Sequence, residues 1–228
     1  MRVAEIFKSV QGEGFLTGTE SVFVRVAGCN LRCRFCDTPY ASWQPEGEDL
    51  SVETVLSRAA QWETKHVVLT GGEPMLFAQL AALTHGLRRL DRHITIETAG
   101  TRFLPVACDL MSISPKLSNS TPSRAAHPGW AQRHDSRRNA PDVIRRLVRR
   151  YAYQVKFVVD SVAACREVER YLAEFPEIDR SCVMLMPEGT DLRALSERAE
   201  WLVPCCAAAG LRYCPRRQIE WFGPVRGT

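Results

Sequence analysis

The sequence has no long apolar run. No stretch approaches the roughly 18 to 20 consecutive apolar residues that cross a bilayer, and residues 1–15 contain no apolar segment typical of a secretory signal. We therefore expect a cytoplasmic protein with no membrane partner. An internal repeat is also missing. With 45% apolar and 25% charged residues, the 228 residues suit one globular domain, residues 1–228, rather than a solenoid or a multidomain assembly.

Cysteine, in contrast, is abundant, with nine in the chain. In a cytosolic protein, spaced cysteines more often bind metal or do redox chemistry than form disulfides. Cys29, Cys33 and Cys36 form a Cys-x3-Cys-x2-Cys motif directly after a predicted strand. Three thiolates this close can surround one soft metal centre, and an iron–sulfur cube held by only three would keep one iron open for chemistry. Zinc is the alternative, although the paired knuckles typical of zinc sites are missing. The other six cysteines have no such spacing and are predicted to be buried apolar residues.

Strands and helices alternate along the chain. Alternating or β-branched apolar segments predict six strands, at residues 21–27, 66–70, 93–98, 109–114, 154–159 and 182–186. Helical periodicity lies between them, with Ser51 and Asp191 as predicted caps. This order predicts βαβ units and a parallel sheet. About six strands fit an open, partial β/α barrel better than a closed eight-stranded barrel, which typically needs about 250 residues. The tail at 211–222 is predicted to be irregular or extended.

Polar motifs lie at the carboxyl ends of four of the predicted strands. In parallel sheets, ligands bind at the carboxyl ends of the strands. We therefore expect the functional site at this edge, built from residues 70–74 (TGGEP), 97–98 (ET), 114–116 (SPK) and 186–188 (MPE).

Positive charge is concentrated in residues 118–150. This segment holds eight arginines and two aspartates, whereas the whole chain has a net charge of only +4. The stretch from 119 to 140 is polar and aperiodic, so we predict a basic, mobile or lid-like insertion with solvated His127 and His134. An anionic partner remains an alternative, but we expect no nucleic-acid partner.

The cysteine motif, with Phe35 just before its third cysteine, and the GGEP sequence at 71–74 together resemble the radical S-adenosylmethionine (SAM) superfamily. The resemblance implies a 4Fe–4S cluster on Cys29, Cys33 and Cys36 whose open iron chelates SAM. Reductive cleavage of SAM then gives a 5′-deoxyadenosyl radical, and the protein positions cofactor and substrate. It also implies a reducing electron donor such as a flavodoxin or ferredoxin.

Further segments narrow the resemblance. Residues 9–14 (SVQGEG), Arg25, residues 36–38 (CDT) and residues 186–189 (MPEG) make the chain similar to the 7-carboxy-7-deazaguanine synthase family. This similarity implies a lyase that converts 6-carboxy-5,6,7,8-tetrahydropterin to 7-carboxy-7-deazaguanine with loss of ammonia, in 7-deazapurine (queuosine) biosynthesis. It also implies SAM as a regenerated cofactor, Mg²⁺ support and a homodimer. Only the segment at 118–150 matches nothing in the family.

The family resemblance also assigns roles to individual residues. Arg25 offers a planar fork suited to a carboxylate, and the Thr38 hydroxyl is a hard oxygen ligand suited to Mg²⁺. Glu73 is expected to pair with the ammonium of SAM, whereas Gln154 and Lys156 either face the site or lie solvated on a strand. The implied substrate contacts are Val10, Gln11, Gly12, Arg25 and Thr70; the implied SAM contacts are Phe35, Cys36, Asp37, Gly72, Ser114, Pro115, Lys116, Met186, Pro187, Glu188 and Gly189.

Two other functions stay open at this stage. One is a radical SAM activase that acts on a partner protein, and the other is a non-catalytic metal-binding interaction module that uses the arginine-rich segment. The Gly-rich turn at 11–14 favours the pterin enzyme, because such a turn lets backbone groups approach a flat heterocycle.

Overall fold

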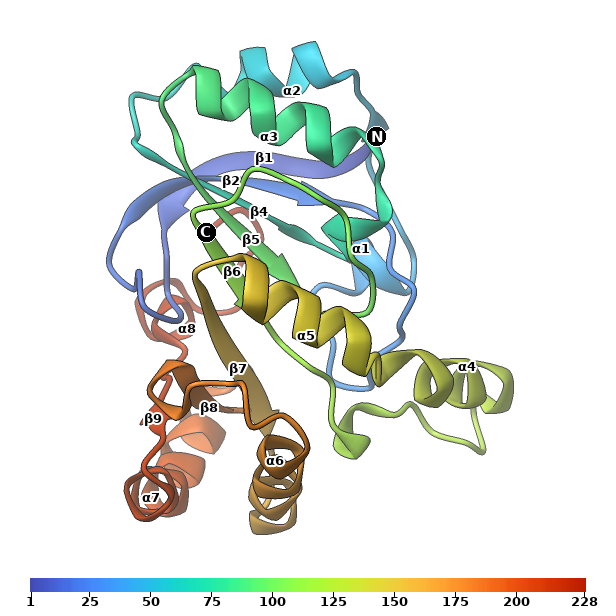
Figure 1. The fold of residues 1–228 in the computed structure, drawn as a ribbon, viewed down its shortest axis with the longest axis vertical. Helices are drawn as coiled ribbons and strands as arrows, with labels where there is room; N and C mark the ends of the chain where they lie inside the picture. The colour runs from blue at the N-terminus through green and yellow to red at the C-terminus, as the bar shows by residue number, and fades with distance from the viewer.

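The computed structural model describes residues 1–228 and contains one open sheet of nine strands (Figure 1). Its strand order is β3-β1-β2-β4-β5-β6-β7-β8-β9. All neighbours from β2 to β9 pair in parallel, whereas β1 and β3 add antiparallel pairs at one edge. The strands are β1 (Arg2–Val10), β2 (Glu20–Val26), β3 (Glu48–Asp49), β4 (His66–Gly71), β5 (His93–Thr98), β6 (Leu110–Ile113), β7 (Tyr153–Val159), β8 (Val183–Pro187) and β9 (Arg212–Tyr213). The six predicted strands and the open, mostly parallel sheet are confirmed.

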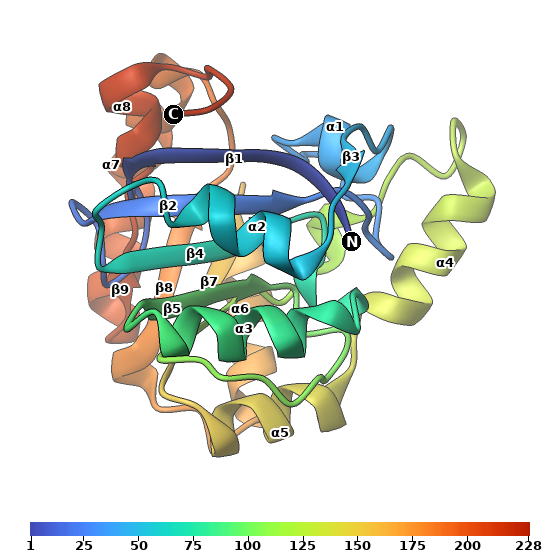
Figure 2. The same ribbon diagram turned by 90° about the horizontal axis from the view of Figure 1, so that it is seen from above.

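Helices cover the outer face of this sheet (Figures 1 and 2). Ser51 and Asp191 cap two of them as predicted, because their side chains accept hydrogen bonds from Thr54 N and Ala194 N. None of the helices combines the length and apolarity of a bilayer-spanning segment. The helices are α1 (Pro39–Ser42), α2 (Val52–Ala59), α3 (Gln79–Arg89), α4 (Pro128–Arg138), α5 (Pro141–Arg150), α6 (Val162–Glu174), α7 (Leu192–Ala209) and α8 (Arg217–Phe222).

Each central strand divides its side chains between two faces. On β2, Val22, Val24 and Val26 belong to the main hydrophobic core, while Phe23 and Arg25 line a cavity on the other face. The same alternation brings Thr70, Glu97, Ser112 and Lys156 to the cavity face of β4, β5, β6 and β7. Burial of each large apolar side chain contributes about 1.5–3 kcal/mol. Packing against the helices therefore fixes the register that presents these polar side chains.

The basic segment differs from its prediction. Residues 128–138 and 141–150 form α4 and α5, with Pro128 and Pro141 in the first helical turn, where proline is favoured. On α5, Ile144 and Leu147 enter the main core. Of these two helices, α4 has no apolar stripe, which explains why its sequence predicts a loop. It projects from the body of the protein (Figure 2).

Candidate active site

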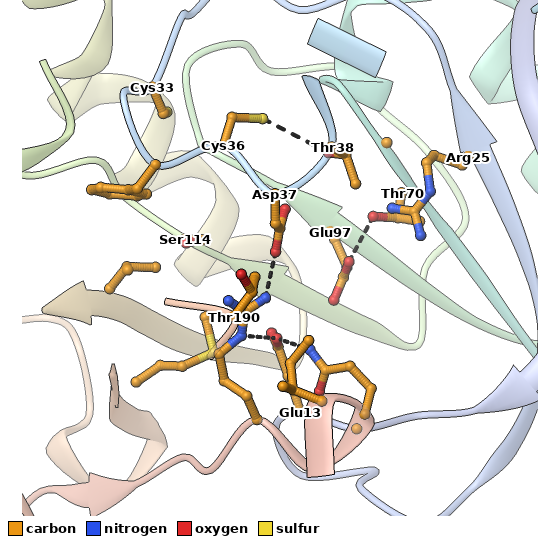
Figure 3. Close-up of a pocket in the computed structure, with 18 of the residues that line it drawn as sticks. Glu13, Arg25, Cys33, Cys36, Asp37, Thr38, Thr70, Glu97, Ser114 and Thr190 are labelled. Atoms are coloured by element: carbon orange, nitrogen blue, oxygen red, sulfur yellow. Dashed lines mark hydrogen bonds and ion pairs between the residues drawn. The ribbon is translucent and has the colours of Figure 1, made fainter. Parts of the chain in front are cut away.

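A cavity of about 380 Å³ lies at the carboxyl ends of the parallel strands (Figure 3). This volume is in the range of small-molecule sites. All five predicted substrate contacts and all four predicted metal ligands line it. Of the eleven predicted SAM contacts, only Pro115 and Pro187 do not line it. The strand register adds detail, since Arg25 on β2 pairs with Thr70 on β4 and lies beside it.

The three clustered cysteines lie in one loop after β2, the cluster loop (residues 27–38). Their side chains line the cavity and form no disulfide. Burial raises the pKa of Cys29 to about 12 and that of Cys33 to about 11. All three cysteines are half-buried, and three thiols on one cavity wall are the kind of donor set that an iron–sulfur centre takes. The three side chains are not arranged as ligands of a single metal ion; Cys29, Cys33 and Cys36 would instead hold a cluster of several irons, which would supply electrons.

Cys36 and Thr38 lie close together at the end of the cluster loop. The Cys36 thiol is 3.1 Å from Ser42 Oγ and 3.8 Å from Thr38 Oγ1. Although Thr38 precedes α1, its hydroxyl makes no capping bond to the helix. Thr38 lines the cavity, and the Cys36 thiol is the protein partner of its hydroxyl.

Glu73 does not take the predicted role. Its side chain is fully buried and accepts hydrogen bonds from Met75 N (3.1 Å), Thr98 Oγ1 (2.8 Å) and Ala99 N (2.8 Å). Burial raises its pKa, against the effect of these bonds. The carboxyl group thus links the turn after β4 to the end of β5 and does not line the cavity.

Gly72 has a structural reason to lack a side chain. A Cβ atom there would lie 2.1 Å from the carbonyl oxygen of Gly28. The TGGEP turn therefore packs directly against the start of the cluster loop, and the two motifs hold each other in place.

A buried ionic network, which sequence reasoning largely missed, crosses the cavity. Lys156 Nζ donates to Glu13 Oε2 (2.9 Å) and to Glu97 Oε1 (3.3 Å), and Thr70 Oγ1 donates to Glu97 Oε2 (2.6 Å). The Lys156 side chain is only 5% exposed, so Lys156 is not a solvated strand residue. Burial disfavours its ammonium, but Glu13 and Glu97 outweigh burial and raise the pKa of Lys156.

Arg216 joins this network to the cluster loop. Its Nε donates to Glu13 Oε1 (3.2 Å), its Nη1 to Gly189 O (2.6 Å), and its Nη2 to Asp37. Gln218 Nε2 also donates to Glu13 Oε1 (2.6 Å). The predicted irregular tail thus contains α8 and supplies two site residues that no motif signalled, and residues 223–228 line the cavity as well.

The Arg25 guanidinium is bound to the protein through its Nε, and its two terminal amino groups are unpaired. Its Nε donates to Glu5 Oε1 (2.6 Å), which also accepts from Tyr40 OH (2.9 Å). The two terminal amino groups of Arg25 have no hydrogen-bond partner in the protein. Because Arg25 lines the cavity, these groups are available to a ligand carboxylate.

His134 is buried, contrary to the prediction that it is solvated. Its Nδ1 accepts from Arg32 N in the cluster loop (3.2 Å), and its Nε2 lies 2.8 Å from Ser120 Oγ. Its side chain has no exposed surface, and burial lowers its pKa to about 4. His127, in contrast, is exposed as expected.

The six remaining cysteines only partly follow their prediction. Cys165, Cys206 and Cys214 are buried, while Cys108, Cys182 and Cys205 are half-buried.

Comparison with known proteins agrees with this geometry. The Radical SAM superfamily profile matches residues 23–167. A 7-carboxy-7-deazaguanine synthase of Rhodopirellula baltica is 48% identical over 99% of this chain and 88% of that protein. The chain belongs to the 7-carboxy-7-deazaguanine synthase family. A relative of the same name from Halobacterium salinarum is 41% identical over 99% of this chain and 92% of its own length.

Solved structures with low sequence identity share this fold. The crystal structure of QueE from Escherichia coli has a TM-score of 0.70 and 23% identity, covering 95% of this chain and 93% of that one. SuiB of Streptococcus suis bound to S-adenosylmethionine has a TM-score of 0.52 and 14% identity, covering 82% of this chain and 48% of that one.

The lowered pKa of Glu13 makes the stability of the fold depend on pH in a way that can be measured. Burial opposes its ionisation, but Lys156 and Arg216 lower its pKa from an ordinary 4.5 to about 2. Its ionised form therefore stabilises the fold above pH 4.5, and this contribution is lost as the pH falls from 4.5 through 2. We expect Glu13→Gln to lower the free energy of unfolding at pH 6 by on the order of 2 kcal/mol, with a smaller loss at pH 3.

Urea unfolding of the apoprotein between pH 3 and pH 6 measures this difference. The exposed Glu63, which makes no side-chain contact of this kind, gives the matched control Glu63→Gln. A gap between wild type and Glu13→Gln that stays constant over this pH range contradicts the role assigned to the ion network.

Proposed function

We propose that this chain is a 7-carboxy-7-deazaguanine synthase, a radical SAM lyase. It converts 6-carboxy-5,6,7,8-tetrahydropterin to 7-carboxy-7-deazaguanine with loss of ammonia, in 7-deazapurine (queuosine) biosynthesis. The observation that carries the proposal is the single cavity that brings the three cysteine thiols together with Arg25 and Thr70. The near full-length identity to synthases of this name supports it.

In this proposal, Cys29, Cys33 and Cys36 hold a 4Fe–4S cluster. When bound, the cluster supplies the electron for reductive cleavage of SAM. Nine predicted contacts that line the cavity are suited to hold SAM: Phe35, Cys36, Asp37, Gly72, Ser114, Lys116, Met186, Glu188 and Gly189. Lys116 is fixed for this by a 2.7 Å hydrogen bond to Ser114 Oγ.

The substrate then lies between the turn at 10–12 and Arg25. The free amino groups of Arg25 bind its carboxylate, and Glu13, Glu97 and Lys156 present fixed acceptors and a donor to the heterocycle. Such paired charges inside a cavity are preorganised and need no rearrangement when a polar substrate enters. An activase or a plain binding module has no use for this arrangement, and the relatives do not favour either.

Further parts of the proposal concern partners and conditions. Thr38 contributes a ligand to Mg²⁺, which supports turnover. A flavodoxin or ferredoxin supplies electrons, the active form is a homodimer in the cytoplasm, and the chain acts as a single domain.

The proposed function predicts that the wild-type protein, reconstituted with iron and sulfide under anaerobic conditions, cleaves SAM and converts carboxytetrahydropterin to the deazaguanine. A variant with alanine at positions 29, 33 and 36 should bind no cluster and do neither, because no other cysteines share their loop. Iron and sulfide analysis and product chromatography measure both. A four-iron complement in the triple variant would falsify the ligand assignment, and a wild type that cleaves SAM but leaves the pterin unchanged overturns the substrate.

Arg25→Lys keeps the positive charge but removes the planar guanidinium that can bind a carboxylate through two hydrogen bonds. A charge-assisted, bidentate contact contributes about 1.5–3 kcal/mol, so kcat/KM for the pterin should fall roughly tenfold or more. SAM affinity without substrate should stay unchanged. Arg58→Lys, on the exposed face of α2, is the control. Loss of SAM binding together with turnover shows instead that Arg25 supports the cluster loop.

Thr38→Ala removes the proposed Mg²⁺ ligand. We expect a several-fold higher Mg²⁺ concentration for half-maximal turnover, while Thr38→Ser, which keeps the hydroxyl, follows the wild type. Steady-state rates across a Mg²⁺ titration measure this. If the titration of Thr38→Ala overlays that of the wild type, Thr38 only shapes the turn before α1.

A further inference from the structure

Three arginines form an uncompensated positive surface beside the cluster loop. They are Arg32 in that loop and Arg133 and Arg137 on α4, and we call them the α4 basic surface. None has an acidic partner within ion-pair distance. Asp135, the only acid on α4, is already paired with Arg124 and Arg138. The α4 basic surface therefore keeps its full charge.

These charges are held against the loop that carries the cysteines. The Arg32 guanidinium stacks 4.1 Å from the Trp130 ring centroid, and Arg133 lies 5.5 Å from the same ring. Arg137 Nη1 donates to Asn30 O (3.3 Å). The contacts of Arg32 and Arg137 join α4 to the cluster loop, and Arg133 packs on the same Trp130 ring as Arg32. The three charges therefore have a defined position next to the loop that carries Cys29 and Cys33.

The helix itself is anchored at the same boundary. Ala131 and His134 are the residues of α4 with no exposed surface, and the His134 imidazole bonds the backbone of Arg32 on one side and Ser120 on the other. Arg133 and Arg137, four residues apart on α4, are exposed. The outer face of α4 is thus polar, positive and fixed relative to the thiols.

We propose that the α4 basic surface docks an acidic, one-electron carrier protein that reduces the cluster. This inference rests on the proposed function, which requires such reduction. One electron passes from the carrier, which is oxidised, to the cluster, which is reduced, and no bond forms or breaks. A protein carrier fits better than a nucleic acid because the charges adjoin the thiols and form a compact patch, whereas a polynucleotide needs an extended track of phosphate contacts. Complementary charge raises the rate of encounter and orients the partner.

The test uses the reconstituted holoenzyme and reduced flavodoxin, a strongly acidic carrier, as the probe. The variant is Arg133→Glu with Arg137→Glu. The control is Arg166→Glu with Arg170→Glu, which makes the same charge change at the same helical spacing on α6, where both arginines are exposed and unpaired. Calorimetric titration gives the Kd of flavodoxin at low and high salt. Stopped-flow bleaching of the cluster gives the rate at which flavodoxin, or dithionite, reduces it. Neither the Kd nor this rate depends on the pterin.

We expect the α4 variant to bind flavodoxin at least tenfold more weakly at low salt and to lose most of the salt dependence that the wild type shows. Its reduction by dithionite should equal that of the wild type, and the α6 control should follow the wild type in every measurement. Equal flavodoxin affinity in wild type and α4 variant overturns the proposal. If the α6 control loses as much flavodoxin affinity as the α4 variant, the effect comes from net charge alone, and the proposal is also overturned. The same calorimetric titration with transfer RNA in place of flavodoxin tests the other macromolecule: if the α4 variant loses RNA binding while its flavodoxin binding is intact, the proposal is overturned and the surface belongs to nucleic acid. Failure of pterin turnover alone leaves the docking result standing and refutes only the proposed function.

Discussion

Lys156 carries its ammonium group into the hollow of the open sheet, where its side chain is 5% exposed. A buried charge without a partner costs several kcal/mol, so the hollow must also contain acids. Glu13 and Glu97 meet this need, and Arg216 balances the second oxygen of Glu13. These partners come from the turn after β1, from β5 and from the chain just before α8. One buried cation thus ties together segments that no strand pairing joins.

The parallel core was predictable because its information is local. Short apolar segments separated by helical periodicity predict β2 and β4 to β8, and the polar motifs at their ends predict the side of the sheet on which the site lies. The edge strands carry no such local signal. β3 is only Glu48 and Asp49 and exists because β1 offers it a partner. β9 consists of Arg212 and Tyr213 and depends on β8 in the same way.

Site residues divide along the same line. Cys29, Cys33, Cys36 and the TGGEP turn follow one another closely, so their spacing in sequence predicts their chemistry. Arg216 and Gln218 reach Glu13 across 203 and 205 residues, and only the folded topology makes them neighbours. For Glu73, the sequence shows a carboxylate beside a motif but not whether its side chain enters the cavity or the protein interior. The burial of His134 depends on contact with the cluster loop, which a polar helix sequence does not reveal.

The two ends of the sheet never pair with each other. They are joined by a single backbone hydrogen bond from Arg217 N to Gly12 O (3.0 Å) and by side chains, including Gln218 with Glu13 and Arg226 with Glu5 and Glu46. Separating any two neighbouring strands in the middle of the sheet breaks a whole ladder of backbone bonds, whereas these two ends are held by the buried Glu13–Arg216 pair and by the close approach of Gly12 to Gln218, where a Cβ atom would lie 2.4 Å from Gln218 N. The wall of the cavity is therefore closed here by the identity of a few side chains and not by strand pairing. A substitution at Gly12 or Glu13 would open this wall, while the same substitution on a central strand would leave the backbone ladder in place.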